Sequence, residues 1–116
     1  MRKRFSGSVV CEPRHPSWLT SETDKLLGEF EVARVAADPA PLPRGTEPGG
    51  WNGLIYYRLH GSPNMYYSKY SLDYLDALRN NLTSLGPSVT TWCIFDNTAR
   101  GAATVNALAL LERLQI

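Results

Sequence analysis

Short apolar runs alternate along this chain with segments whose apolar residues recur at helical spacing. The pattern predicts strands near residues 8–12, 32–37, 54–60 and 89–95, and helices near 22–29, 71–85 and 99–114. Strands that alternate with helices are joined by right-handed crossovers and pair in parallel. The chain is therefore expected to be an α/β protein of four parallel strand–helix units, forming either an open sheet or part of a barrel.

Local signals define where several of these elements begin and end. Ser21 and Ser71 are expected to be helix N-caps, and Gly86–Pro87 is expected to end the second helix. The segment Pro39–Gly53 holds four prolines and four glycines, which predicts an irregular loop. The expected inner face of the last helix consists of Ala103, Ala107, Leu110, Leu111 and Leu114.

The composition describes one small globular domain. The chain has 116 residues, of which 43% are hydrophobic, and its net charge of +1 gives no global signature of nucleic-acid or membrane binding. Residues 1–5 are basic but no apolar stretch follows them, so no signal peptide is expected, and no run is long enough for a membrane span. These patterns favour a cytoplasmic protein without a membrane partner.

Two cysteines are present, and their spacing fits no zinc motif. Cys11 lies one residue before Glu12 and Cys93 three residues before Asp96, both odd spacings, so strand alternation turns each thiol to the face opposite the polar strand-end residue. Both are expected to be buried structural thiols rather than nucleophiles.

Polar residues gather where the predicted strands end, which is the ligand-binding end of a parallel sheet. They are Glu12, Arg14 and His15, then Asp38, then Arg58 and His60, then Asp96 and Asn97. Residues two apart on a strand share a face, so Arg58 and His60 are expected to point the same way. Charged groups in this layer either neutralise one another as ion pairs or form a site, and their position favours a site.

The residue types suggest a division of roles at this end of the sheet. His60 is the candidate general acid or base, with Glu12 or Asp96 as its catalytic partner. The candidate ligand-binding residues are Arg14, His15, Asp38, Arg58, Lys69, Asn97, Thr98 and Gly101.

The start of the last helix is a candidate anion site. Asn97 or Thr98 is expected to cap this helix, and backbone N–H groups of its first turn, around Gly101, suit a phosphate or carboxylate. The alternative is an ordinary helix start in which Arg100 faces solvent.

Two further interpretations stay open. A divalent metal held by Glu12, His15, Asp38 and His60 is less favoured, since no ligand spacing supports it and nearby arginines repel a cation. No metal is therefore assigned, and the cofactor is unknown.

The tyrosines at 66, 67 and 70 either stack on a base or sugar ring or pack onto the adjacent helix, and packing is favoured.

Four motifs, in the same order along the chain, resemble the last half of the YecE-like family, domain of unknown function 72. They are CEPRHPSW at 11–18, YYRLHG at 56–61, YSKYS at 67–71 and WCIFDNTARGAATVNAL at 92–108. The resemblance implies a barrel of eight strand–helix units with no established reaction, and it assigns the four strands here to positions five to eight. Residues 1–116 are thus expected to form a truncated, C-terminal half-barrel without the first four strands.

Three functions follow as hypotheses. The first is a barrel domain that recognises a phosphate-bearing or other anionic ligand, with hydrolysis as an open option. The second is a module that binds nucleic-acid phosphate or a metabolite without chemistry, and the third is an inactive half-barrel. Because a half-barrel leaves apolar edges near residues 8–12 and 89–95, self-association through those edges is also expected.

Overall fold

The computed structural model describes residues 6–86 and 88–114 of the chain. The basic residues 1–5 and Pro87, which formed part of the expected helix stop, lie outside the described residues. The strands are β1 (Val9–Cys11), β2 (Val32–Arg34), β3 (Ala36–Asp38), β4 (Gly49–Gly50), β5 (Leu54–Leu59) and β6 (Thr90–Phe95). The α-helices are α1 (Ser21–Glu29), α2 (Leu72–Ser84) and α3 (Ala102–Leu114), and η1 (Pro16–Trp18) and η2 (Pro43–Thr46) are short 3₁₀ helices.

The strands form two three-stranded groups, β1–β2–β4 and β3–β5–β6, and every pair except β2–β4 is parallel. Strand β1 pairs with β2, and β3 pairs with β5, which in turn pairs with β6 from Leu54↔Thr90 to Leu59↔Phe95. Only Val35 separates β2 from β3, and its N–H donates to the Cys11 carbonyl at 2.8 Å, so these two strands are one interrupted strand. The expected mixed α/β fold with a parallel sheet is confirmed.

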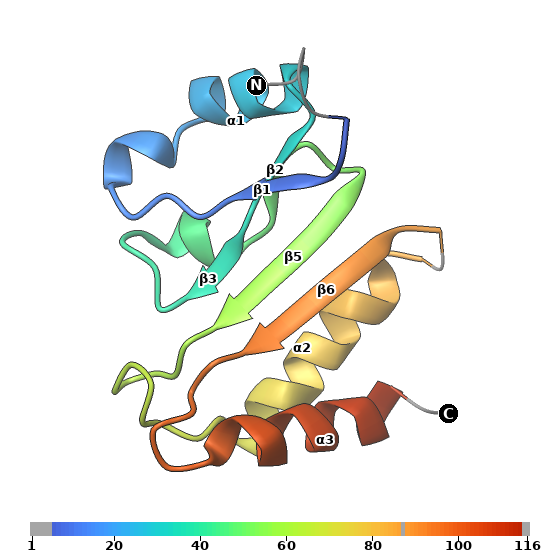
Figure 1. Cartoon of the computed structure of the whole chain (residues 1–116). Coiled ribbons are helices and arrows are strands. Elements are labelled where there is room, and N and C mark those ends of the chain that lie inside the picture. The colour runs from blue at the N-terminus through green and yellow to red at the C-terminus, as the bar shows by residue number, and fades with distance from the viewer. Residues whose placement is uncertain (1–5, 87, 115–116) are drawn as a thin grey trace.

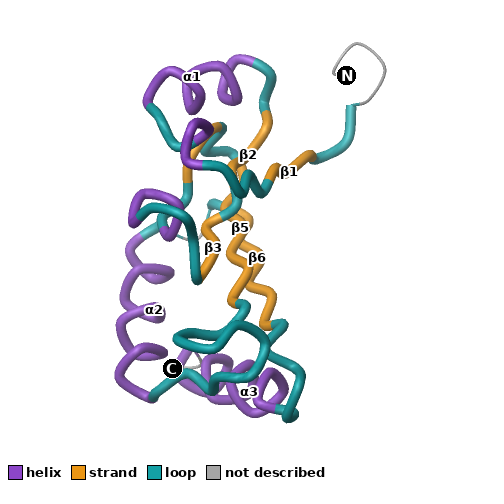
Figure 2. Tube along the Cα trace, turned by 90° about the vertical axis from the view of Figure 1, so that its left-hand side faces the viewer, coloured by secondary structure: helices purple, strands orange, loops and turns teal. Residues whose placement is uncertain are grey.

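Helices α1 and α2 lie on one side of the strands, and α3 packs against α2 and β6. The arrows of β3, β5 and β6 run in the same direction in Figure 1, and the view in Figure 2 shows α1 and α2 on one side of the strands. The core fills the space between β3, β5, α2 and α3 and contains Ala36, Ile55, Tyr57, Leu59, Tyr70, Leu75, Leu78 and Leu110. None of the helices in the described part of the chain combines the length and apolar character that crossing a membrane requires.

Local sequence signals explain most of the element boundaries. Ser71 caps α2, since its side chain accepts from the Tyr74 N–H as expected. The cap of α1 is Thr20 and not Ser21, because the Thr20 hydroxyl accepts from the Thr23 N–H. The loop from Pro39 to Gly53 contains one further short strand, β4, which pairs antiparallel with β2.

The inner face of α3 differs from the expected one. Ala103, Asn106 and Leu110 are buried, whereas Ala107 and Leu111 are exposed. Both faces of this helix carry apolar residues, so periodicity alone did not separate the inner face from the outer one.

A buried arginine joins α1 to the sheet. The Arg34 side chain is 1% exposed, and its Nε donates to an Asp24 carboxylate oxygen at 2.9 Å. Arg44, whose side chain is 43% exposed, contacts the other oxygen of Asp24 at 3.4 Å. Gly49 of β4 passes against the Arg34 guanidinium so closely that a Cβ would collide with it, which explains the glycine at this position.

Replacing Asp24 with asparagine is expected to lower the free energy of unfolding by about 3 kcal/mol, because Arg34 is left buried without its counter-charge. The Arg44→Met variant, which removes the exposed partner of the same carboxylate, is expected to cost less than about 1 kcal/mol. Urea unfolding at pH 7 measures both values. Equal losses in the two variants would show that burial of Arg34 does not set the cost.

The same carboxylate predicts part of the acid sensitivity of the fold. Burial alone raises the pKa of Asp24, but hydrogen bonds and charge from Arg34 and Arg44 lower it below its ordinary value. Because the pKa of Asp24 is lower in the folded chain than in the unfolded chain, its ionised carboxylate stabilises the fold at any pH above the ordinary carboxyl pKa. That stabilisation is lost as the pH falls through the lowered pKa of the folded state. The Asp24→Asn variant is expected to lack that component of the acid-induced loss.

Candidate functional site

Side chains from three strands meet at the carboxyl end of the sheet. Glu12 follows β1, Arg58 lies in β5, and His60 and Asp96 follow β5 and β6. Strand β5 and strand β6 are in register up to Leu59↔Phe95, which brings their next residues to the same edge. Alternation turns the side chains of Arg58 and His60 to the face of the sheet opposite the core residues Tyr57 and Leu59.

His60 occupies the centre of this cluster and its side chain is 1% exposed. Its Nδ1 lies 2.7 and 2.8 Å from the two carboxylate oxygens of Asp96. Its Nε2 lies 3.1 Å from a Glu12 oxygen and 2.8 Å from an Arg14 guanidinium nitrogen. With Nδ1–H donated to Asp96, Nε2 either accepts from Arg14 or, when protonated, donates to Glu12. A proton can therefore enter or leave at Nε2 while the ring keeps its position.

Two arginines surround the histidine and balance its carboxylates. Arg58 contacts Glu12 at 3.1 Å and Asp96 at 2.8 Å, and Arg14 contacts Glu12 at 2.5 Å. Burial alone lowers the pKa of Arg58, but the charges of Glu12 and Asp96 raise it above its ordinary value. The charges of the two guanidinium groups and the two carboxylates around the imidazole sum to zero. The arginine side chains remain 43% and 39% exposed, so both reach solvent at the rim of the cluster.

Tyr66 closes the cluster on the side of the loop between β5 and α2. Its ring meets the His60 ring edge-on, with centroids 5.8 Å apart. The Tyr66 backbone has a φ of 68°, its N–H donates to the His60 carbonyl at 2.5 Å, and its carbonyl accepts from the Ala99 N–H at 3.0 Å. This residue therefore joins the loops that follow β5 and β6.

The structure does not bring His15, Asp38 and Lys69 into the cluster. His15 caps η1, where its Nδ1 accepts from the Ser17 N–H at 3.2 Å. The Asp38 carboxylate instead accepts the Tyr70 hydroxyl at 2.6 Å, and burial together with this bond raises the pKa of Tyr70. Asp38 and Lys69 line a separate cavity of about 250 Å³, together with Ser62, Tyr70, Ser71 and Tyr74.

The expected cap and anion site at the start of α3 also look different in the structure. The Asn97 side chain is fully buried and does not cap the helix, because its Oδ1 accepts no hydrogen bond. Its Nδ2 donates to the Ser68 carbonyl and to Asn106 Oδ1, each at 2.9 Å. Asn106 in turn holds the backbone N–H and carbonyl of Tyr70. Thr98 and Gly101 lie in the exposed turn before α3, and Gly101 has a φ of 76°. Asn97 is thus a structural residue that fastens the loop after β5.

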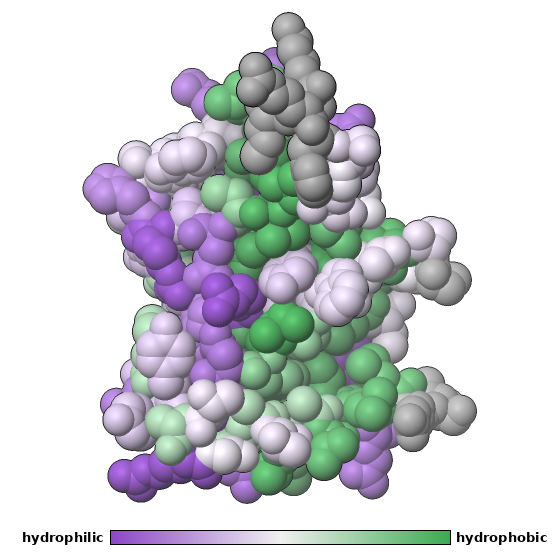
Figure 3. Space-filling view, viewed as in Figure 1, coloured by the Kyte–Doolittle hydropathy of each residue, from purple (hydrophilic) through white to green (hydrophobic). Residues whose placement is uncertain are grey.

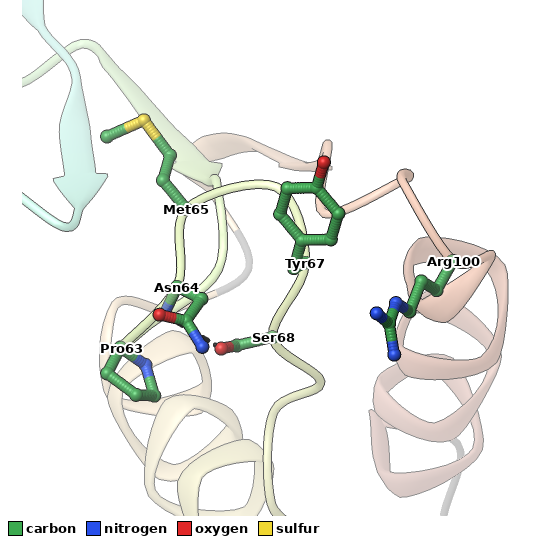
Figure 4. Close-up of a pocket in the computed structure, with 6 residues that line it drawn as sticks. All are labelled: Pro63, Asn64, Met65, Tyr67, Ser68 and Arg100. Atoms are coloured by element: carbon green, nitrogen blue, oxygen red, sulfur yellow. Dashed lines mark hydrogen bonds between the residues drawn. The ribbon is translucent and has the colours of Figure 1, made fainter.

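A second cavity, of about 610 Å³, lies between that loop and the start of α3. Figure 4 shows Arg100 extending from the α3 side toward the loop, and its guanidinium lies 5.9 Å from the centre of the Tyr67 ring. The lining residues are Pro63, Asn64, Met65, Tyr67, Ser68 and Arg100. The sequence pointed to the loop tyrosines as candidate ligand-binding residues but not to Asn64, Met65 and Ser68. The only sequence feature that could have pointed to these three residues is the polar, aromatic character of the loop.

The two thiols are only partly buried, and not fully buried as expected, but they are poor candidates for chemistry. Burial raises the pKa of Cys93 to about 12, and burial and the charge of Glu12 raise the pKa of Cys11. Cys93 lines an apolar cavity with Leu82 and Leu110. Among the described residues, no three His, Cys, Asp or Glu side chains are grouped in a way that could hold a metal ion.

The fold and the cluster together describe a parallel α/β protein with a charged, histidine-centred group of residues at the carboxyl ends of its strands. The family model for the protein of unknown function DUF72 matches residues 1–116, so the chain belongs to this family, as the four motifs had indicated. No curated protein matches the chain.

Solved structures of the same family have the same fold. A DUF72 protein from Thermotoga maritima is 26% identical, with a TM-score of 0.81, and the match covers 99% of this chain and 49% of that protein. A DUF72 protein from Enterococcus faecalis is 21% identical, with a TM-score of 0.79, and the match covers 99% of this chain and 52% of that protein. The chain thus spans about half the length of these solved relatives.

The structural role of Asn97, before α3, can be tested against its exposed neighbour Thr98. The Asn97→Ala variant is expected to lose about 2 kcal/mol of unfolding free energy, because the Ser68 carbonyl and Asn106 lose a buried donor. The neighbouring Thr98→Ala change, at an exposed position, is expected to stay within about 0.5 kcal/mol of the unmodified chain. Urea unfolding distinguishes the two. A larger loss for Thr98→Ala would overturn the structural role of Asn97.

Proposed function

We propose that the strand-end cluster binds a phosphate-bearing or other anionic ligand and that His60 exchanges a proton with it. The observation that carries this proposal is the placement of one buried imidazole between two carboxylates, with two half-exposed guanidinium groups at its rim. Arg14 and Arg58 are the anion-binding groups. Their planar, multi-donor ends suit the oxygens of a phosphate or carboxylate.

The roles of the acidic residues follow from the contacts of the imidazole. Asp96 accepts from Nδ1 and fixes the tautomer, which leaves Nε2 to accept or donate the proton that moves. Glu12 competes with an incoming anion for Arg14 and Arg58, so a ligand replaces an internal ion pair rather than meeting a bare positive charge. Asp38, His15 and Lys69 lie away from this arrangement and have no role in it.

Hydrolysis of a phosphate ester is the reaction that best fits these groups. Nε2 of His60 takes a proton from a water molecule whose oxygen bonds to phosphorus, and the bond to the leaving oxygen breaks. The same proton then passes to the leaving oxygen. Arg58 stabilises the charge that spreads over the phosphoryl oxygens.

Binding without chemistry is the second candidate, and the burial of His60 favours it. With 1% of its side chain exposed, the imidazole meets a ligand only when Arg14 moves aside. A metabolite or the phosphates of a nucleic acid could then occupy the rim and leave Nε2 untouched. A steep loss of nucleic-acid affinity with salt, without turnover, would support this candidate.

The proposal includes a half-barrel architecture. The assignment to strands five to eight of a barrel is supported by parallel strands in chain order, by α1 and α2 on one side of them (Figure 2), and by a length about half that of the solved relatives. We also propose a cytoplasmic location, which the two cysteines support because both are free thiols.

Arg58 and Arg100 form a matched pair for testing the site. The Arg58→Ala variant is expected to weaken binding of inorganic phosphate by roughly tenfold or more, because it leaves Glu12 and Asp96 to repel the anion. The Arg100→Ala variant removes an equal charge from the second cavity and is expected to leave this affinity within about twofold. Phosphate titration followed by NMR of the His60 ring measures both. Equal effects would contradict the ranking.

His60→Gln separates binding from hydrolysis in the same experiment. It is expected to abolish release of nitrophenol from p-nitrophenyl phosphate while phosphate still binds, since the arginines remain. The Arg58→Lys variant, which keeps the positive charge, controls for misfolding caused by loss of the ion pairs. Phosphate binding without any nitrophenol release from the unmodified chain would favour the binding module.

A further inference from the structure

Two edges of the parallel sheet are open in the structure. Within the described residues, β1 pairs with β2 alone and β6 pairs with β5 alone. The two strands are the outer members of two three-stranded groups, β1–β2–β4 and β3–β5–β6, which follow one another along the interrupted strand β2–β3. In Figure 1, β1 and β6 lie on opposite sides of β5. An open edge presents unpaired N–H and carbonyl groups that a further strand can bind.

The face of the sheet away from α1 and α2 is bare and partly apolar. Trp92 of β6 is 54% exposed there, and alternation places Ile94 on the same side. Figure 3, which looks onto this face, shows apolar surface in the upper middle and toward the lower right of the molecule, with less apolar residues between them. A single chain therefore leaves to solvent the side chains that would fill the interior of a barrel.

Two helices also carry apolar residues on their outer surfaces. On α3 these are Val105, Leu108 and Leu111, which are 52%, 61% and 51% exposed, and the segment 104–111 has no charged residue. At α1 they are Leu26 and Phe30, the residue that follows the last turn of the helix, and they are 52% and 53% exposed. Helix α3 lies beside β6 and α1 lies beside β1 and β2, at opposite ends of the molecule in Figures 1 and 2. Each open edge is thus accompanied by its own apolar helix surface.

We propose that a second copy of this chain covers these surfaces and closes an eight-stranded ring with twofold symmetry. A twofold axis parallel to the strands places β6 of each copy beside β1 of the other, with all strands still parallel. The same operation sets the outer stripe of α3 in each copy against α1 of the other copy. This inference rests on the half-barrel architecture proposed above and not on the chemistry of the strand-end cluster.

The choice of a second copy as the occupant follows from length and closure. The chain covers 49–52% of the solved relatives, so two chains supply the length of one relative. The two edges and the two helix surfaces differ from each other, and one twofold rotation satisfies all four at once, leaving no edge for further growth. In the closed ring, two strand-end clusters face a common opening.

Leu108 and Leu72 allow a matched test, because both are leucines on helices with similar exposure, 61% and 58%. Sedimentation velocity of the 116-residue chain over a concentration series is expected to reach a plateau at twice the chain mass of 12.9 kDa. The Leu108→Glu variant is expected to raise the dimer dissociation constant by roughly tenfold or more, because α3 loses apolar contact with the other copy. The Leu72→Glu variant, at the start of α2, is expected to leave the constant within about twofold.

Three outcomes would overturn the proposal: a monomer at every concentration, growth beyond two chains without a plateau, or equal effects of Leu108→Glu and Leu72→Glu. Hydrogen exchange of the unmodified chain gives a readout that does not depend on any variant. Amides of β1 and β6 are expected to exchange more slowly as the concentration rises, while those of α2 do not change. Retention of phosphate binding by monomeric Leu108→Glu would show that the site stands apart from the dimer.

Discussion

The contacts of His60 are the constraint on which the arrangement of the strand ends depends. One buried imidazole bonds to Glu12 after β1 and to Asp96 after β6, although those two strands belong to different three-stranded groups. The reach across the sheet is possible because Ala37, which is in register with Arg58, contributes only a methyl group to that face. The polar cluster therefore connects the residues that follow β1 with those that follow β5 and β6. The partial exposure of Arg14 and Arg58 then gives the cluster its access to solvent.

Much of the fold could be predicted from the sequence, since each strand combines an apolar run with a polar end, and Ser71 marks the start of α2 as its N-cap. The meeting of Glu12, Arg58, His60 and Asp96 was readable for the same reason, because parallel strands bring their carboxyl ends together. The roles assigned to these residues remain predictions.

Other features depend on partners that local patterns do not reveal. Asn97 resembled a helix cap, but its partner Asn106 lies nine residues further along and serves Tyr70, 36 residues before it. The inner face of α3 was ambiguous because Leu110 and Leu111 are equally apolar, and only packing against the core decides between them. Arg34 showed no sign of burial in its own segment, since its counter-charge comes from Asp24 on a helix. In each case long-range geometry, not residue type, determined the outcome.

The backbone of Tyr66 links two regions that the chemistry treats separately. Its N–H donates to the His60 carbonyl and its carbonyl accepts from the Ala99 N–H. Its backbone has a positive φ, which costs conformational energy for a residue with a side chain of this size. The backbone of Tyr66 thus connects the strand-end cluster directly to the cavity lined by Arg100. A molecule that widened that cavity would pull on the backbone of His60, so occupancy at one place would be felt as a change of imidazole position at the other.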